Sequence, residues 1–314
     1  MKTFKILVAA AAVSASSASF AMPTLITEWD FFNEAGWINW QPSTAITASG
    51  QSDDGLGSIL STGPLSTDLC WGSPSTSSGQ SCLDIDSPKT QNSTQSWDEN
   101  GIFQDINGGS AQGRVQTVAA NTSYESGFKD GTSIRHRNFI ITGDSLENVT
   151  LVDGLQLQGF YNTNETTGSV LAPELEFSIN FNETRNSGDS TGACPFGPNS
   201  GTAGSINENG CADIFTVLGF QGGNILAQGS DFIDFSVDFV VNGLAPDIHK
   251  RYELITRLSG LQTIAGTFGF ATEENQVNVL SAQLAVRAIP EPSTVGVLAL
   301  GLIGLTLAGR RKKS

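Results

Sequence analysis

Two stretches of this 314-residue chain alternate apolar and polar side chains with a period of two. In 173–182, the apolar residues at 175, 177, 179 and 181 alternate with Glu, Ser and Asn. In 233–241, Ile, Phe and Val occupy one face, and Asp and Ser occupy most of the other. Because successive side chains of a strand point to opposite faces, each stretch predicts a strand that is buried on one side.

Less regular alternation predicts further strands, separated by turn-rich segments. They are 25–32, 134–141, 149–161, 214–220, 261–270 and 277–286. The segment 252–258 fits either a helix or a strand. No strand–helix–strand repeat appears, so we expect an all-β fold, an antiparallel β-sandwich. The segments 49–63, 71–80 and 187–210 are expected to be loops.

The first 21 residues have the pattern of an export signal. Lys2 and Lys5 precede the apolar run 6–13, and small residues at positions 19 and 21 form a signal peptidase site. We expect cleavage after Ala21, so that 1–21 is a signal peptide and takes no part in the fold.

The four cysteines form two pairs that are close in sequence, Cys70 with Cys82 and Cys194 with Cys211. In an exported protein this pattern predicts two disulfides, although four cysteines allow three pairings. A zinc site is the weaker alternative, because the spacings are not C-x-x-C and the chain has only two histidines.

The last 25 residues have three parts: a Pro-Glu-Pro triplet, an uncharged apolar segment at 294–308 and a basic cluster. The triplet is Pro290, Glu291 and Pro292, and the cluster is Arg310, Arg311, Lys312 and Lys313. As a helix, 294–308 spans about 22 Å, short of the roughly 30 Å of a bilayer core. We therefore expect a transmembrane helix that is inserted temporarily, with its cations on the cytoplasmic side.

This three-part order resembles the PEP-CTERM sorting signal of Gram-negative bacteria. The resemblance implies recognition near 290–292 by an exosortase, a membrane transpeptidase, and then release or attachment outside the cell. An ordinary tail anchor is the alternative. The same tail is sometimes labelled an ice-binding protein C-terminal domain. The chain has no regular Thr-rich repeat, so that label would describe the sorting signal and not ice binding.

A second resemblance covers much of 134–286. His136 and Asn138, followed by Ile-x-Gly at 141–143 and the strand at 149–158, resemble the Thr-His-x-Asn motif of the THxN family of PEP-CTERM proteins. Arg135 stands where the family has Thr. The match continues through 177–184, Cys194, Cys211, 213–215 and 270–275. The family implies no known activity.

On a strand, residues two apart share a face, so His136 and Asn138 are expected to lie together. That arrangement serves a metal or a ligand, or else a hydrogen-bonded pair that fixes a turn. We expect the structural role, because buried polar groups usually have hydrogen-bond partners.

Charge excludes one class of partner. Without the six cations of the two terminal signals and without Glu291, the body 22–289 keeps 10 basic and 30 acidic residues, a net charge of about −20. Such a body repels nucleic acid and anionic membrane surfaces, whose binding needs clustered Lys and Arg. We expect no nucleic-acid partner.

The sequence Gly-Asp-Ser-Leu at 143–146 matches the motif of GDSL esterases. Ser145 would be the nucleophile, with His249 as its base and Asp247 as the orienting acid. However, the motif lies deep in a β-rich chain, the Asp-x-x-His spacing is one residue short, and the Gly and Asn of the oxyanion hole are missing. The esterase is a remote alternative, and we expect no catalysis.

Aromatic and acidic residues suggest two kinds of ligand. All five tryptophans, Trp29, Trp37, Trp40, Trp71 and Trp97, fall in the first hundred residues. On an exposed face they would bind exopolysaccharide, although we expect them in the core. The acidic pairs Asp84/Asp86 and Asp53/Asp54 suit calcium, but the EF-hand spacing is absent. We expect no cofactor and no resident metal.

These features together predict three segments: a signal peptide at 1–21, a β-sandwich body at 22–289 and a sorting signal at 290–314. We expect a structural or adhesive protein, with a carbohydrate-binding module as the alternative. Its expected partners are signal peptidase and exosortase, with extracellular polysaccharide in the alternative function. It would be secreted or lie at the surface of a Gram-negative bacterium, after a membrane-inserted intermediate.

Overall fold

The computed structural model describes most of the expected body and little of the two terminal signals. The described residues are 24–52, 58–74, 79–86, 95–97, 103–105, 110–162, 165–246, 248–264 and 267–290. The expected signal peptide with its cleavage site at Ala21 lies outside them, and so does the sorting signal beyond Pro290.

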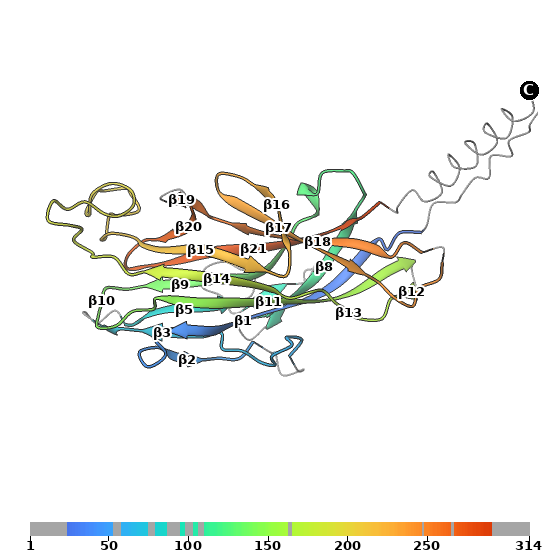
Figure 1. Cartoon of the computed structure of the whole chain (residues 1–314), viewed down its shortest axis with the longest axis horizontal. Coiled ribbons are helices and arrows are strands. Elements are labelled where there is room, and N and C mark those ends of the chain that lie inside the picture. The colour runs from blue at the N-terminus through green and yellow to red at the C-terminus, as the bar shows by residue number, and fades with distance from the viewer. Residues whose placement is uncertain are drawn as a thin grey trace, which may run out of the picture.

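The described residues form strands in most of their length and contain no α-helix (Figure 1). One group of strands comprises β1 Glu28–Gln41, β8 Ser110–Val118, β11 Asn148–Asn162, β12 Glu165–Thr166, β13 Val170–Leu171, β14 Leu175–Asn182, β15 Asp213–Gln221, β19 Gln262–Ile264 and β20 Thr267–Thr272. A second group comprises β2 Thr47–Ser49, β3 Asp68–Trp71, β5 Ser81–Asp86, β9 Lys129–Asn138, β16 Asn224–Gln228, β17 Phe232–Val240, β18 Arg251–Ser259 and β21 Gln276–Ala288. The remaining elements are the strand pairs β4 Ser73–Pro74 with β10 Ile141–Thr142 and β6 Gln95–Trp97 with β7 Phe103–Asp105, and the 3₁₀ turn η1 Glu125–Gly127.

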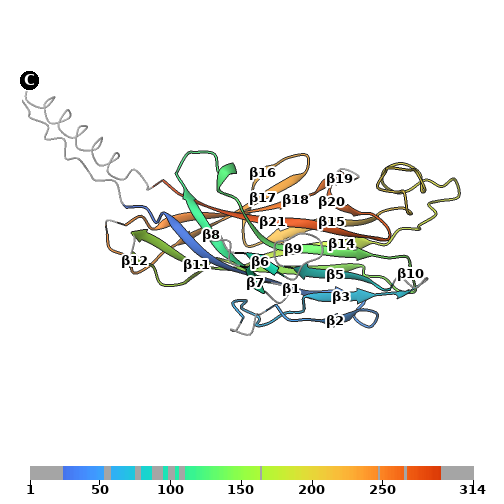
Figure 2. The same cartoon turned by 180° about the vertical axis from the view of Figure 1, so that it is seen from behind.

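The first group is ordered β8-β1-β11-β14-β15-β20-β19, with β12 and β13 also beside β11. The second is ordered β2-β3-β5-β9-β21-β18-β17-β16 (Figure 2). These neighbours are antiparallel, as expected. One pairing corrects the expectation: β8 leaves β1 and runs parallel to β21 at Thr117 and Val118, so it joins the two groups.

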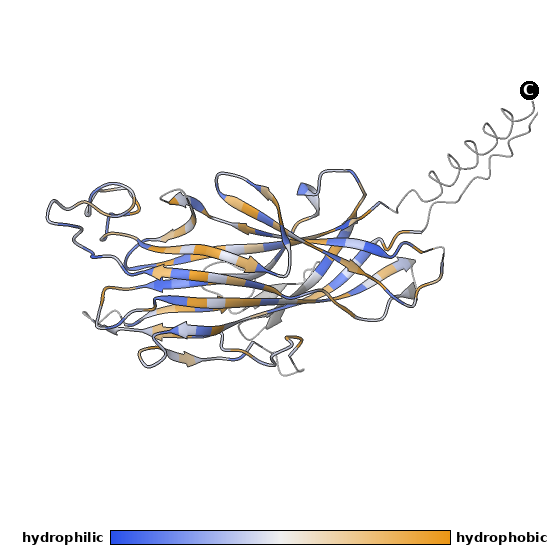
Figure 3. Cartoon of the chain, viewed as in Figure 1, coloured by the Kyte–Doolittle hydropathy of each residue, from blue (hydrophilic) through white to orange (hydrophobic). Residues whose placement is uncertain are grey.

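Apolar residues from both groups of strands share the same core. One buried cluster combines Phe177 and Phe215 of the first group with Leu69 and Leu83 of the second. A second cluster places Trp29 edge-on against Phe239 and Tyr252, with ring centroids 5.5 and 4.9 Å away. Polar and apolar residues alternate along many strands (Figure 3). The two sheets therefore meet through their apolar faces, and each large side chain buried there contributes about 1.5–3 kcal/mol.

The regular alternation predicted strands correctly. The stretches 173–182 and 233–241 form β14 and β17, and the side chains of β14 alternate between buried and less buried along its length. The helical alternative for 252–258 was wrong: this segment forms β18, which pairs with β17 and β21 on its two sides. The expected loop at 187–210 contains no strand.

Within the described part of the chain, no helix is both long and apolar enough to cross a membrane. The predicted transmembrane segment 294–308 lies outside the described residues.

Candidate functional site

Three carboxylates meet where the strands β14, β15 and β20 come side by side. Glu183 directly follows β14, Asp213 begins β15, and Glu274 lies two residues after β20. The pairings Asn182↔Ile214 and Asp213↔Thr272 bring these strand ends together. The long β14–β15 connection is closed beside them by the disulfide Cys194–Cys211, two residues before Asp213.

The cluster, defined as Glu183, Asp213 and Glu274, is tight and largely shielded from water. One carboxylate oxygen from each residue lies within 4.8 Å of the others. Asp213 and Glu274 are 0% exposed, and Glu183 is partly buried. No Lys or Arg among the described residues forms an ion pair with any of the three.

Few hydrogen bonds satisfy these oxygens. The backbone N–H of Thr184 donates to Asp213 Oδ1 at 2.7 Å, and Trp71 Nε1 donates to Glu183 Oε2 at 3.5 Å. Among the described residues, Asp213 Oδ2 has no hydrogen-bond partner, and the Glu274 carboxylate interacts with the side chain of Asn138 but has no close hydrogen bond. An unsatisfied buried oxygen is unfavourable, and an unsatisfied buried charge is more so.

Because no counter-charge among the described residues lies beside them, these carboxyls stay protonated up to a higher pH than exposed carboxyls do. Burial raises the pKa of Glu183 to about 7. Burial and the charge of Glu183 raise the pKa of Glu274 to about 8. The pKa of Asp213 lies well above its ordinary value because of burial and the charges of Glu183 and Glu274. Three ionised carboxylates without a counter-charge are unfavourable in this arrangement, and a bound cation would stabilise them.

His136 and Asn138 share a face of β9, as predicted, and both contact Thr272 of β20. His136 Nδ1 and Thr272 Oγ1 share a hydrogen bond of 2.9 Å, and Asn138 Nδ2 donates to the Thr272 carbonyl at 3.1 Å. Both side chains are fully buried, and His136 Nε2 and Asn138 Oδ1 have no partner among the described residues. Burial lowers the pKa of His136 to about 3, so the imidazole is neutral.

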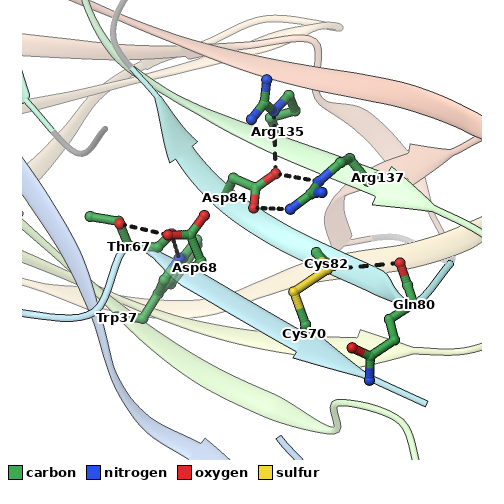
Figure 4. Close-up of polar contacts among 9 residues, drawn as sticks. All are labelled: Trp37, Thr67, Asp68, Cys70, Gln80, Cys82, Asp84, Arg135 and Arg137. Atoms are coloured by element: carbon green, nitrogen blue, oxygen red, sulfur yellow. Dashed lines mark hydrogen bonds and ion pairs between the residues drawn. A yellow bond between two sulfur atoms is a disulfide. The ribbon is translucent and has the colours of Figure 1, made fainter. Parts of the chain in front are cut away.

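Arg135, the departure from the THxN pattern, takes part in a different polar group on β9 (Figure 4). Its Nε donates to Asp84 Oδ2 at 3.2 Å, while Arg137 donates to both Asp84 oxygens at 2.8 Å. Burial favours the neutral form of Asp84, but hydrogen bonds from Arg137 and Asp68 and the arginine charges hold its pKa below the ordinary value.

The calcium site suggested at Asp84 was therefore wrong, because Asp84 lies within β5 and its oxygens already bind two arginines. The side chain of Asp86, and both Asp53 and Asp54, lie outside what the structure describes. Asp68, opposite Asp84 in the β3–β5 pair, has a pKa raised to about 6 by burial and by its hydrogen bond with Asp84.

The predicted cysteine pairing agrees with the structure, which contains the disulfides Cys70–Cys82 and Cys194–Cys211 and no free cysteine. Cys70 and Cys82 face each other directly across β3 and β5.

The expected core position of the tryptophans is confirmed for Trp29, Trp37 and Trp71, which are 0–1% exposed. Trp40 packs against the buried cluster that contains Trp37 and Trp71, and the Trp97 side chain lies outside the described residues. The buried three cannot form a platform for sugar stacking.

The proposed esterase triad is not assembled. Ser145 lies three residues before Asn148, which pairs with Gln41 at one end of β1. His249 donates its backbone N–H to the carbonyl of Thr24, beyond the Glu28 end of the same strand. Thirteen residues of strand separate these ends, roughly 40 Å. Asp247 lies outside the described residues.

The comparison with protein families gave a match at the C-terminal end of the chain. Residues 288–312 match the PEP-CTERM protein-sorting motif. The motif implies an exosortase as processing partner and a secreted or cell-surface protein. No curated protein matches the chain. The THxN resemblance of the body and the ice-binding label gain no support from these comparisons.

Sequence reasoning did not single out Glu183, Asp213 and Glu274 as a set. Each acidic residue lies at or near the end of a strand that contains a buried phenylalanine: Glu183 after Phe181, Asp213 before Phe215 and Glu274 after Phe270. This position at a strand end was the sequence feature that could have indicated the cluster. All three lie in segments quoted for the THxN resemblance, and the structure brings those segments together with Asn138.

Proposed function

We propose that this chain is a structural or adhesive protein of the cell surface or extracellular matrix of a Gram-negative bacterium, without catalytic activity. The observation that carries the proposal is the sorting motif at 288–312. The body suits this role, because two disulfides cross-link its all-β fold. Such bonds persist outside the reducing cytoplasm.

In the proposed route, signal peptidase removes 1–21 and the segment 294–308 then holds the protein in the membrane temporarily. Exosortase acts near the Pro-Glu-Pro triplet. Pro290 is exposed and lies two residues beyond the end of β21. This position supports the proposal that a membrane enzyme reaches the chain at the triplet.

The test of this route is the intact mass of the protein recovered from culture supernatant and from membranes. We expect a supernatant species that ends near Pro290–Pro292 and lacks the apolar segment. The triple substitution Pro290→Ala, Glu291→Ala, Pro292→Ala should leave the full tail on protein in the membrane fraction. A wild-type protein that keeps its full tail in the membrane would instead be a permanently anchored surface protein.

The structural or adhesive role has its own measurement. A strain that lacks the protein should release more matrix material on washing and aggregate less than its parent, and the wild-type gene should restore both properties. The triple substitution should not restore them, because its product stays at the membrane. Unchanged aggregation and matrix retention in the deletion strain would refute the role while leaving the sorting route intact.

A further inference from the structure

We propose that Glu183, Asp213 and Glu274 form a calcium site that ties the β14–β15 connection to the end of β20. This inference is independent of the sorting route and concerns the body of the chain alone.

The geometry of the three carboxylates fits one Ca²⁺ ion. Calcium–oxygen distances are about 2.3–2.6 Å, so two ligands of the same ion can lie up to about 5 Å apart. One carboxylate oxygen from each of the three residues lies within 4.8 Å of the other two. One ion can therefore contact all three residues without a large rearrangement.

Unsatisfied oxygens outside the three carboxylates provide an independent indication of a ligand. The side chain of the fully buried Asn138 interacts with the Glu274 carboxylate, which partly offsets the rise in its pKa caused by burial, and the Asn138 Oδ1 atom has no hydrogen-bond partner among the described residues. The Oδ1 atom of Asn186 is likewise buried and unpartnered. Amide oxygens are usual calcium ligands, so these two atoms extend the donor set to five residues.

Asn186 is close to the cluster as well. A Cβ atom placed on Gly210 would lie 3.0 Å from Glu274 Cγ and 3.1 Å from Asn186 Oδ1, so the two side chains flank the same glycine. Gly210 has a φ of +145°, a conformation that a side chain would strain. The glycine lets the Cys194–Cys211 loop approach Glu274 closely.

The donor chemistry selects the ion. The set consists of carboxylate and amide oxygens, which suit hard cations, and among the described residues no cysteine or histidine joins the 4.8 Å group of Glu183, Asp213 and Glu274. Magnesium demands a near-ideal octahedron and gives up water reluctantly, whereas calcium accepts irregular sets of six to eight oxygens. Glu183 also lines an open surface depression with Asp189 and Cys194, which gives an ion a route from solvent.

The first experiment uses the purified full chain, stripped with EGTA, and thermal unfolding with added CaCl₂, MgCl₂ or NaCl at equal ionic strength. We expect CaCl₂ at a hundredfold excess over Kd to raise Tm by about 5–10 °C. Sites in extracellular modules bind with Kd of about 10⁻⁴–10⁻³ M, which sets the concentration range. No shift with calcium, or an equal shift with magnesium or sodium, would overturn the proposal.

The substitution Glu274→Gln separates a metal site from a structural acidic cluster. In EGTA we expect this variant to unfold at a temperature no lower than that of wild type, because glutamine keeps the shape of the side chain and buries no charge. In calcium it should unfold at a lower temperature than wild type and lose the calcium-induced shift. The matched control is Glu273→Gln, whose carboxylate accepts from Asn209 instead, and its calcium shift should equal that of wild type. An equal loss in both variants would contradict the assignment.

A spectroscopic measurement on the wild-type chain avoids dependence on variant folding. Trp71 lies next to the cluster because its indole N–H donates to Glu183. Tb³⁺, which prefers the same oxygen ligands as Ca²⁺, should give sensitised emission on tryptophan excitation. Added Ca²⁺ should abolish that emission at concentrations where Mg²⁺ does not. Emission that calcium fails to displace would count against the site.

Discussion

Trp71 stacks on His136 in the core, with the ring centroids 5.5 Å apart and the ring planes 18° apart. Phe181 and Phe215 pack edge-on against the same imidazole at 5.6 and 5.0 Å. His136 belongs to β9 and its hydrogen-bond partner Thr272 to β20, so the imidazole connects the two sheets. This aromatic enclosure keeps water away and makes a charged imidazole unfavourable.

The first prediction concerns stability in acid. Burial lowers the pKa of His136 from 6.5 to about 3. Between these values the unfolded chain binds a proton that the folded chain does not, so the free energy of unfolding falls as pH decreases from 6.5 towards 3. The loss is at most about 1.4 kcal/mol per pH unit. Urea unfolding of wild type and His136→Phe from pH 7 to pH 4 measures it.

In His136→Phe the aromatic contacts remain and the titrating group is gone, so its stability should fall less steeply with acid than that of wild type. Parallel slopes for the two proteins over this range would show that His136 does not account for the acid sensitivity.

Periodicity predicted strands from the alternation of residue types and not from burial, since β17 was evident although Asp234 and Ser236 are buried. In β14 the side chains alternate from Leu175 onward, and the strand was evident from the sequence. In β5, every residue from Ser81 to Ile85 is buried, including Asp84, because the two arginines of β9 neutralise that carboxylate. In the sequence, Leu83 and Ile85 alternate with Asp84 and Asp86, but this run of four residues is the shortest that predicts a strand, and it was missed.

The candidate metal site could not be predicted from the sequence, for a different reason. Its residues span positions 138 to 274, and their meeting depends on the order β14-β15-β20, which no local pattern encodes. The body also contains thirty acidic residues, and the sequence alone does not show which three of them lie together. The pairing of His136 with Asn138 was predictable because two residues on one strand share a face.

The second prediction concerns Arg257, which lies between two carboxylates and two aromatic rings. Its guanidinium donates to both oxygens of the fully buried Asp234, at 2.7 and 2.8 Å, and lies 4.0 Å from the centroid of the Phe232 ring. Arg257→Met leaves Asp234 buried without its cation, which should cost about 3–5 kcal/mol in urea unfolding. The control Arg251→Met removes an exposed pair with Asp238 and should cost less than about 1 kcal/mol. Equal losses would contradict this assignment.

The third prediction concerns Asp153, whose Oδ1 accepts a 2.7 Å hydrogen bond from Asn33 beside a small cavity. Burial raises the pKa of Asp153 from 3.8 to about 7. Between these values the folded chain holds an additional proton, so this group makes the free energy of unfolding fall as pH rises from about 4 to 7. Its contribution opposes that of His136, so each is measured as a difference from wild type.

Asp153→Asn keeps the oxygen that accepts from Asn33 and removes the charge. We expect this variant to be more stable than wild type by about 1–2 kcal/mol at pH 8 and similar to it at pH 4. Asp144→Asn, in the exposed loop after β10, is the control and should change stability by less than about 0.5 kcal/mol at either pH. A stability difference that is the same at pH 4 and pH 8 would assign the effect to packing.

The fourth prediction separates the two disulfides. Each closes a short loop, 12 residues apart for Cys70–Cys82 and 17 for Cys194–Cys211, so replacing either pair with serine should cost roughly 3 kcal/mol of stability. Only the second bond lies within the β14–β15 connection, where Gly210 brings Asn186 and Glu274 together. Cys194→Ser/Cys211→Ser should therefore also weaken calcium binding, measured by titration calorimetry at a temperature where both variants are folded. Cys70→Ser/Cys82→Ser should bind calcium as wild type does. If both double variants bind equally, the loop does not shape the site, and the ion would be held by the strand ends alone.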